Sequence, residues 1–175
     1  MPVMIELSLL LFFPFFMAYA GFSDMFTMQI SNMISLALIA GFVFFGFMIG
    51  MDIQTMLWHF AIFAIVLAVT FTLFALGIFG GGDAKLIPCT ALWLGWEHTM
   101  TYIHVSALIG AILALIIMRW RYQPLPDRIT NVEWVGRLYN AKNGIPYGVA
   151  LAAGAMIVYP ETLWMQHLYS LAISQ

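Results

Sequence analysis

The sequence predicts an all-α membrane protein, a bundle of about six transmembrane helices joined by short loops. Hydrophobic residues make up 63% of its 175 residues and charged residues only 8%. A soluble domain carries about 25% charged residues, and the mean hydropathy of +0.97 also indicates a lipid environment. The apolar residues fall into runs near the roughly 20 residues that a helix needs to cross a bilayer. We therefore expect a single transmembrane domain over residues 1–175.

Six apolar segments are candidates for the membrane helices. They are residues 4–22, 33–50, 56–77, 86–96, 100–118 and 145–159. The fourth segment is short for a full crossing and is followed by the polar residues 97–99, and Pro160 closes the last segment. A short helix is expected near residues 133–139, in the charged loop between the last two segments. Because the N-terminus lacks the basic region and cleavage site of a secretory signal, the first segment should stay as a membrane helix.

The positions of the basic residues test this topology. Lysine and arginine occur at Lys85, Arg119, Arg121, Arg128, Arg137 and Lys142. If every segment crosses once, all of them fall on one side, which the positive-inside rule makes the cytoplasmic side. Removing the short fourth segment would place Lys85 opposite the others, so we keep that segment. The outer side then holds both termini and four acids, Glu6, Asp52, Glu97 and Glu161. An aromatic belt is also expected there, formed by Trp93, Trp96 and Trp164.

Composition and spacing argue against nucleic-acid and metal binding. With only 6 Lys and Arg residues, the chain has no basic surface for nucleic acid. Cys89 is the only cysteine, so neither an internal disulfide nor a cysteine zinc site can form, and a buried, unreactive thiol is expected there. The histidines lack the i, i+4 spacing of a helical metal site, so we predict no metal and no other cofactor. His59 and His104 are expected to hydrogen-bond inside the bundle.

The most unusual stretch is Gly80-Gly81-Gly82-Asp83-Ala84-Lys85, which interrupts an almost continuously apolar sequence. Glycine permits backbone conformations and close approaches that a Cβ would forbid, and an ionisable residue at the membrane is costly enough to suggest a function. A plain turn between two helices, with its charges in the water interface, is the alternative. Lys85 could extend to the interface, hold Asp83 ionised, or bind an acidic group of a substrate.

Of the 8 acidic residues, only Asp24 and Asp83 are expected at the same depth on apolar helices. Asp24 lies at the inner end of the first segment and Asp83 at the inner end of the third, so packing these two helices together would bring the carboxylates close. Asp127 and Glu133 are also on the inner side, but they lie among arginines, where a solvated ion pair is the simpler role. Taken alone, Asp24 is more typical of an interfacial residue at a helix end.

Two carboxylates in one partly desolvated site cannot easily both ionise, so one stays protonated and the pair titrates as a unit. An aspartic protease uses this arrangement: the charged carboxylate draws a proton from water, and the protonated one polarises the scissile carbonyl. Asp24 and Asp83 are therefore candidate catalytic residues of a hydrolase.

Three motifs resemble those of one family. Gly80-Gly81-Gly82-Asp83 resembles the GxGD signature of the type IV prepilin peptidases. Asp24 followed by Ile30-Ser31-Asn32 resembles that family's first-aspartate motif, and residues 144–148 resemble the segment that opens its last helix. GxGD alone also occurs in presenilin-type and signal-peptide-peptidase-type proteases, but here the motifs stand in the family's order over roughly residues 5–160. The chain is most similar to the short peptidases of Flp/Tad pilus systems.

The resemblance implies a membrane-embedded aspartic endopeptidase that cleaves the leader peptide from type IV (Flp-type) prepilins, with Asp24 and Asp83 as its catalytic pair. It implies a bacterial inner-membrane protein whose active site faces the cytoplasm. Its partners would be the lipid bilayer and a prepilin, which would offer a membrane-inserted helix and a leader. The other residues matched to the site are Gly80, Gly82, Lys85, Asn32, Pro146, Tyr147 and Gly148. Longer members carry a soluble zinc domain linked to N-methylation, which this chain lacks, so methyltransferase activity is not expected.

Two departures from the family pattern stand out. Ser31 replaces the usual proline, and residues 25–29 lack the basic residues common after the first aspartate. Two other functions stay open. A small channel or carrier could use glycine breaks and buried acids for an ion path, although such acids are expected nearer to mid-membrane. An inactive homologue that only scaffolds pilus assembly would not need the intact aspartate pair.

Overall fold

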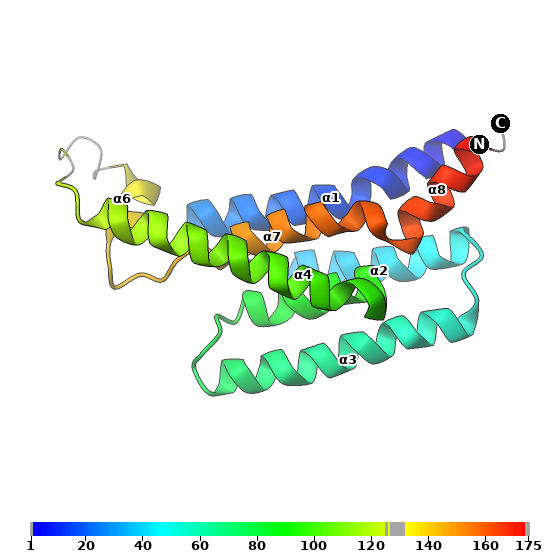
Figure 1. Ribbon diagram of the computed structural model, residues 1–175, viewed down its shortest axis with the longest axis horizontal. Helices are drawn as coiled ribbons and strands as arrows, with labels where there is room; N and C mark the ends of the chain where they lie inside the picture. The colour runs from blue at the N-terminus through cyan, green and yellow to red at the C-terminus, as the bar shows by residue number, and fades with distance from the viewer. Residues whose placement is uncertain (1, 125, 127–131, 174–175) are drawn as a thin grey trace.

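The computed structural model describes residues 2–124, 126 and 132–173, and over this range its regular structure is helical (Figure 1). The elements are α1 Pro2–Thr27, α2 Asn32–Met48, α3 Ile53–Ala75, α4 Asp83–Arg121, α6 Glu133–Tyr139, α7 Tyr147–Val158, the 3-10 turn η1 Tyr159–Glu161, and α8 Leu163–Ile173. The predicted all-α fold is confirmed for these residues, and α6 coincides with the expected short helix. Helix α8, which continues the chain beyond Pro160, was not expected. Asp127 and Arg128 lie outside the described residues.

Helix α1 ends at Thr27, beyond the end of its apolar run. The Thr27 hydroxyl donates to the backbone oxygen of Ser23 at 2.6 Å, so this polar side chain is satisfied within the last turn. Met28 then adopts a left-handed φ of 55°, and its N–H donates to the backbone oxygen of Asp24 at 2.9 Å, a common helix ending. Asp24 therefore lies in the helix itself rather than in a polar loop.

Helix α4 contains the predicted fourth and fifth segments as two legs that meet at Gly95. Gly95 has φ 72° and ψ −177°, a combination that a residue with a Cβ rarely adopts. The first leg, residues 83–94, runs parallel to α2, because Lys85 binds Asn32 near the start of both helices and residue 93 binds residue 38 further along. The second leg, residues 96–121, runs antiparallel to α7, with residue 110 beside residue 147 and residue 106 beside residue 154.

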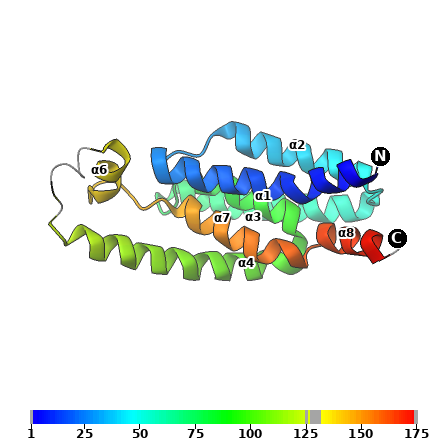
Figure 2. The same cartoon turned by 90° about the horizontal axis from the view of Figure 1, so that it is seen from above.

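The two legs of α4 run in opposite directions, as Figures 1 and 2 show. Helix α7 is antiparallel to α1, since Asp24 contacts Gly148 and Leu9 contacts Tyr159. Helix α2 is also antiparallel to α1, which it follows after a short connection. The first leg therefore runs against α1 and the second leg along it. Both legs of α4 thus point from Gly95 toward the end of the bundle that holds α6, here called the α6 end, and the longer second leg extends further than the first. The opposite end is the Gly95 end.

Among the residues that the structure describes, three helices are long and apolar enough to cross a membrane: Ser8–Thr27, Ile53–Ala75 and Asp83–Arg121. A fourth is added if Tyr147–Glu161 and Leu163–Ser170, which meet at 41°, form one broken span. The first leg of α4 is only about 18 Å long, against a hydrocarbon core of ~30 Å. These helices support a membrane bundle, but they do not establish the predicted number of six crossings.

The core is built around Trp93 and Trp164, which are both fully buried. The Trp93 indole N–H donates to the backbone oxygen of Leu38 at 2.9 Å, and that of Trp164 donates to the backbone oxygen of Trp93 at 2.8 Å. The prediction that both tryptophans stand in an outer aromatic belt is wrong, because each finds a backbone acceptor inside the bundle. Of the three residues in that prediction, Trp96 is the exposed one, at 65%.

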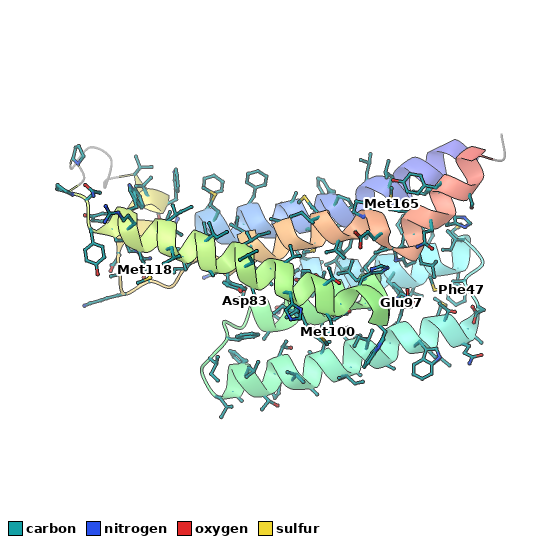
Figure 3. All side chains as sticks on the ribbon, in the orientation of Figure 1. Phe47, Asp83, Glu97, Met100, Met118 and Met165 are labelled. Carbon is teal, nitrogen blue, oxygen red and sulfur yellow. The ribbon has the colours of Figure 1, made fainter. Side chains whose placement is uncertain are left out.

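The acids separate onto the two ends of the bundle. Figure 3 shows Asp83 toward the α6 end and Glu97 toward the Gly95 end. Asp52 caps the start of α3 and Glu161 follows α7, both at the Gly95 end. This separation leaves Asp24 and Asp83 together at the other end.

Candidate active site

A cleft of about 440 Å³ opens at the α6 end, where the end of α1, the start of α4 and the segment before α7 meet. Its walls are formed by Asp24, Met28, Gln29, Ile30, Gly80, Gly81, Gly82, Asp83, Lys85, Gly144 and Ile145. Two carboxyl groups therefore line one cleft from different elements, Asp24 from α1 and Asp83 from α4.

Asp24 is held by the start of α7. Its Oδ2 accepts a hydrogen bond from the backbone N–H of Gly148 at 2.7 Å, and the residue is 8% exposed. The N–H groups of a first helical turn lack helical partners and lie at the positive end of the helix dipole, so this position favours a carboxylate. A Cβ on Gly148 would lie 2.8 Å from Oδ2 of Asp24 and 2.9 Å from Cδ1 of Ile30. Glycine at position 148 thus lets α7 approach Asp24 closely enough to hold it.

Asp83 is the first residue of α4 and is half-buried. The chain enters the helix through backbone bonds from Ala84 to Gly80 and from Leu86 to Gly82, each 3.0 Å long. A Cβ on Gly80 would lie 3.2 Å from Oδ2 of Asp83. Because the glycines before Asp83 carry no side chains, its carboxyl group stays open to the cleft.

The aspartates meet in a different way from the one that the sequence suggested. Helix α1 packs mainly on α7, and α3 packs mainly on α4, rather than α1 on α3. Asp83 begins α4 instead of ending α3. Ile30, which is 6% exposed, lies close to both Gly82, the residue before Asp83, and Gly148, the residue that binds Asp24. The α1–α7 pair carries one carboxyl group and α4 carries the other, and Ile30 packs where these elements meet.

Lys85 lines the cleft, and its ammonium group donates to the side-chain oxygen of Asn32. Asn32 is the first residue of α2, so this bond ties the start of α2 to the first turn of α4. Among the described residues, Lys85 has no carboxylate partner within ion-pair distance. The structure therefore does not support the idea that Lys85 holds Asp83 ionised through an ion pair.

Pro146 and Tyr147 stand behind the cleft rather than in its wall. Pro146 directly precedes α7, and the Tyr147 hydroxyl donates to the backbone oxygen of Ser106 at 3.5 Å. The Tyr147 ring packs on Gly110 in the second leg of α4. These two residues fix where α7 starts, and Gly148 follows them at the position that contacts Asp24.

The family model of the type IV leader peptidase family matches residues 11–115. This range is more than half of the chain, and it contains Asp24, Asp83 and the helices that present them. The chain belongs to the type IV leader peptidase family. No curated protein and no solved structure matches it.

The cleft of this leader peptidase contains residues that were not predicted as site residues, although Ile30, Gly144 and Ile145 stand in two of the matched motifs. Met28, Gln29 and Ile30 come from the connection after α1, and Gly144 and Ile145 come from the connection before α7. The signal in the sequence for Ile30, Gly144 and Ile145 was the motif in which each of them stands. Met28 and Gln29 are not motif residues, and nothing in the sequence marked them as lining residues.

A larger cleft of about 710 Å³ opens at the Gly95 end of the leader peptidase, lined in part by His59 and Glu97. The Nδ1 atom of His59 pairs with the backbone oxygen of Leu92 at 2.6 Å, so this histidine serves the packing of α3 on α4. Asp52, nearby, accepts two hydrogen bonds from Thr55, which hold its pKa below the usual value. The described residues contain no group of three metal-ligating side chains. The residues that line this cleft include one acid, Glu97, and not a pair of carboxyl groups as at the α6 end.

Proposed function

We propose that this leader peptidase is an aspartic endopeptidase that removes the leader from Flp-type type IV prepilins. It would work in the bacterial inner membrane, as a single peptidase domain over residues 1–175, with its cleft facing the cytoplasm. The observation that carries the proposal is that Asp24 and Asp83, held by separate helices, line one cleft. Lys85 and Arg121 lie at the same end of the bundle, which supports the cytoplasmic side through the positive-inside rule.

The surroundings of the two carboxyl groups suggest which one carries the charge. Asp24 accepts a direct N–H bond of 2.7 Å at the start of α7, and such a bond favours the ionised form. Asp83 also begins a helix, but the hydrogen bonds found among the described residues include none to its carboxyl group. We therefore assign the carboxylate to Asp24 and the shared proton to Asp83.

In the proposed reaction, Asp24 takes a proton from water while the water oxygen bonds to the scissile carbonyl carbon. Asp83 gives its proton to the carbonyl oxygen, which forms a neutral tetrahedral diol. The C–N bond then breaks as the leaving nitrogen takes the proton from Asp24. Asp83 recovers its proton from the diol hydroxyl, which leaves a carboxylic acid, an amine and both aspartates in their initial states.

A groove beside the cleft suits the apolar helix of a membrane-inserted substrate. It has a volume of about 220 Å³ and lies between α1 and α7. It is lined by Ala18, Gly21, Phe22, Met25, Val149, Ala152, Ala153 and Met156. Small residues let helices approach closely in lipid, where packing rather than the hydrophobic effect drives association. The same two helices carry Asp24 and Gly148, so a helix seated here would bring its leader to the cleft.

The test of the proposed chemistry is co-expression with candidate Flp-type prepilins, with loss of the leader measured by mass. Asp24→Asn and Asp83→Asn should each abolish cleavage while the protein still inserts, because a carboxamide can neither act as the base nor share the proton. Asp52→Asn is the matched control, since asparagine caps a helix about as well as aspartate. Normal processing by either site variant would sink the proposal, and ion flux in proteoliposomes that depends on Asp83 would favour a channel instead.

The groove is tested by filling it. Ala153→Trp should slow cleavage of a membrane-inserted prepilin but not of a soluble peptide that contains only the leader and the cleaved bond. The control is Ala64→Trp, which adds the same side chain at an exposed position on α3. This variant should cleave both substrates at the rate of the unaltered protein. Equal cleavage of a prepilin with and without its apolar helix would rule out this docking site.

A further inference from the structure

The short helix α6 is tied by arginines to the segments that carry and support Asp24. Helix α6 is at the same end of the bundle as the cleft but does not line it. Its packing contacts run to α1 and to α4. Its polar connections come from two guanidinium groups, Arg121 on α4 and Arg137 on α6, and from the Tyr139 hydroxyl, which donates to the backbone oxygen of Gln123 at 2.8 Å.

Arg121 binds three backbone carbonyls with one side chain. Its Nε donates to the oxygen of Leu138 at 2.9 Å, and its Nη2 donates to the oxygens of Asn143 and Gly144 at 3.2 and 2.9 Å. Leu138 lies in the last turn of α6, where carbonyls lack helical partners. The other two carbonyls belong to the strap, residues 140–146, which leads from α6 into α7. Arg121 therefore fixes the strap against the end of α4.

Arg137 makes the corresponding connection to α1. Its Nη2 donates to the backbone oxygen of Phe26 at 2.8 Å, and its Nη1 meets Glu133 at 3.3 Å. Phe26 lies in the last turn of α1, two residues after Asp24, where carbonyls again lack helical partners. The ring of Trp134 packs edge-on against the ring of Phe26, with centroids 5.3 Å apart. The end of α1 is thus capped by α6 through a polar and an aromatic contact.

The strap closes a ring of contacts that passes through Asp24. The side-chain amide of Asn143 donates to the backbone oxygen of Arg137 at 2.9 Å, which binds the strap to α6 a second time. The chain then continues from Gly144 through residues 145–147 to Gly148, whose N–H meets Asp24. From Asp24 the path returns along α1 to Phe26 and Arg137.

We propose that Arg121 and Arg137 form an arginine clasp that positions the Gly148 amide on Asp24 and the strap at the edge of the cleft. The clasp rests on the proposed function, since it serves an active site at Asp24 and Asp83. Neither arginine lines the cleft, so both act as positioning residues and not as catalytic residues. Among the described residues Arg121 has no carboxylate partner, and its charge is satisfied by carbonyls.

Arginine is the residue that this geometry requires. A guanidinium is planar and carries five N–H donors in a fixed fork, so it can hold several carbonyls at set angles. Lysine keeps the charge but presents a single nitrogen, which cannot reach the carbonyls of both α6 and the strap in the same way. Arg121→Lys and Arg121→Gln therefore separate the geometry of the side chain from its charge.

The first test is amide hydrogen exchange of the full chain in lipid nanodiscs, which needs no substrate. Arg121→Gln should speed exchange about 10-fold in peptides that cover the strap and the first turn of α7, and should leave peptides of α3 unchanged. Arg137→Gln should do the same at the end of α1. Arg121→Lys should also speed exchange in the strap, and it is the variant to use if the glutamine variant does not fold. Arg119→Gln, an exposed position on the same helix end, is the matched control. Unchanged exchange in the folded Arg121 variants overturns the clasp.

The second test is the kinetics of prepilin cleavage. We expect kcat of Arg121→Gln to fall roughly 10- to 100-fold, the scale of a small misplacement in an active site, while KM stays within about threefold. Arg121→Lys should not restore kcat. Faster exchange with an unchanged kcat would overturn the positioning role. If the unaltered protein cleaves no prepilin, the proposed function fails, and the exchange data still decide whether the clasp exists.

Discussion

Replacing Gly148 with alanine should impair cleavage by pushing α7 away from Asp24. The added Cβ would lie 2.8 Å from Oδ2 and 2.9 Å from Cβ of Asp24, and 2.9 Å from Cδ1 of Ile30. None of these atoms is the free end of a long flexible side chain at the surface, since Asp24 and Ile30 are both buried. Relief must therefore come from separation of α7 from α1.

The size of the effect follows from the same distances. Non-bonded heavy atoms rest at about 3.5 Å or more, so the helices must separate by about 0.6–0.7 Å. The hydrogen bond from Gly148 to Asp24, now 2.7 Å, would then reach about 3.3–3.4 Å, beyond the usual limit of about 3.2 Å for an N–H···O bond. A hydrogen bond to a charged group contributes about 1.5–3 kcal/mol. At about 1.4 kcal/mol per factor of ten, the rate of cleavage should fall roughly 10- to 100-fold.

The assay is cleavage of a prepilin by purified protein, with the rate divided by the amount of folded protein. Gly154→Ala is the control, because it crowds the same helix at a distance from the cleft. Its Cβ would clash with Oγ of Ser106 and lie 3.1 Å from its Cα, so it should lower stability but leave the rate per folded molecule unchanged. A Gly148→Ala variant that cleaves at the unaltered rate would refute the reasoning. So would an equal loss of rate in both variants, because crowding alone would then explain it.

Two further changes test the frame around the cleft. Gly95→Ala should lower the free energy of unfolding by about 1–3 kcal/mol, because alanine is strained at φ 72° and its Cβ would lie 2.9 Å from Cε1 of His59. A thermal unfolding midpoint equal to that of the unaltered protein would contradict this prediction. The changes in the free energy of unfolding caused by Lys85→Met and by Asn32→Ala should not add in the double variant. We expect a coupling energy of about 0.5–1.5 kcal/mol, because the two residues share one hydrogen bond. Stability changes that simply add in the double variant would show that this bond contributes nothing.

The helices were predictable from the sequence, but not all of their ends. Length and hydropathy located α1 to α4 and α7, because a lipid-exposed helix must be apolar over most of its length. The end of α1 was placed too early, since polarity marks the water interface and not the end of a helix. Ser23 and Thr27 are polar yet helical, and they bond to each other across the last turn. Asp24 lies between them and is therefore fixed by helix geometry.

The pair of aspartates was predictable, whereas the way they meet was not. To select Asp24 and Asp83, it was enough to assign each acid to one side of the membrane. That assignment needs only the number of apolar segments and the positions of the basic residues. The sequence carries no comparable signal for which helices pack against each other. These helices carry large apolar residues on buried and exposed faces alike, such as Phe13 inside and Phe15 outside on α1. Without a polar stripe there is no sign of which face packs, so the contact of α1 with α7 had to come from the structure.

The prediction for the tryptophans failed for a related physical reason. An indole side chain is favoured at a membrane interface because its N–H needs a polar partner. In Trp93 and Trp164 backbone oxygens supply that partner inside the bundle. Residue type and position along a segment cannot distinguish these two ways of satisfying one donor.

Ser31, which stands where the motif resemblance leads us to expect a proline, is accommodated by the connection between α1 and α2. Ser31 has φ −65° and ψ 142°, and its φ is the value that a proline ring imposes. Its hydroxyl also accepts a hydrogen bond from the N–H of Met33 at 3.2 Å, which caps α2 as proline could not. The left-handed Met28 fixes the other end of the connection. Held at both ends, the connection presents Ile30 against Gly82 on one side and Gly148 on the other. The position of Ile30 at the cleft is thus set by a four-residue connection, residues 28–31, and serine satisfies the backbone requirements of that connection in place of proline.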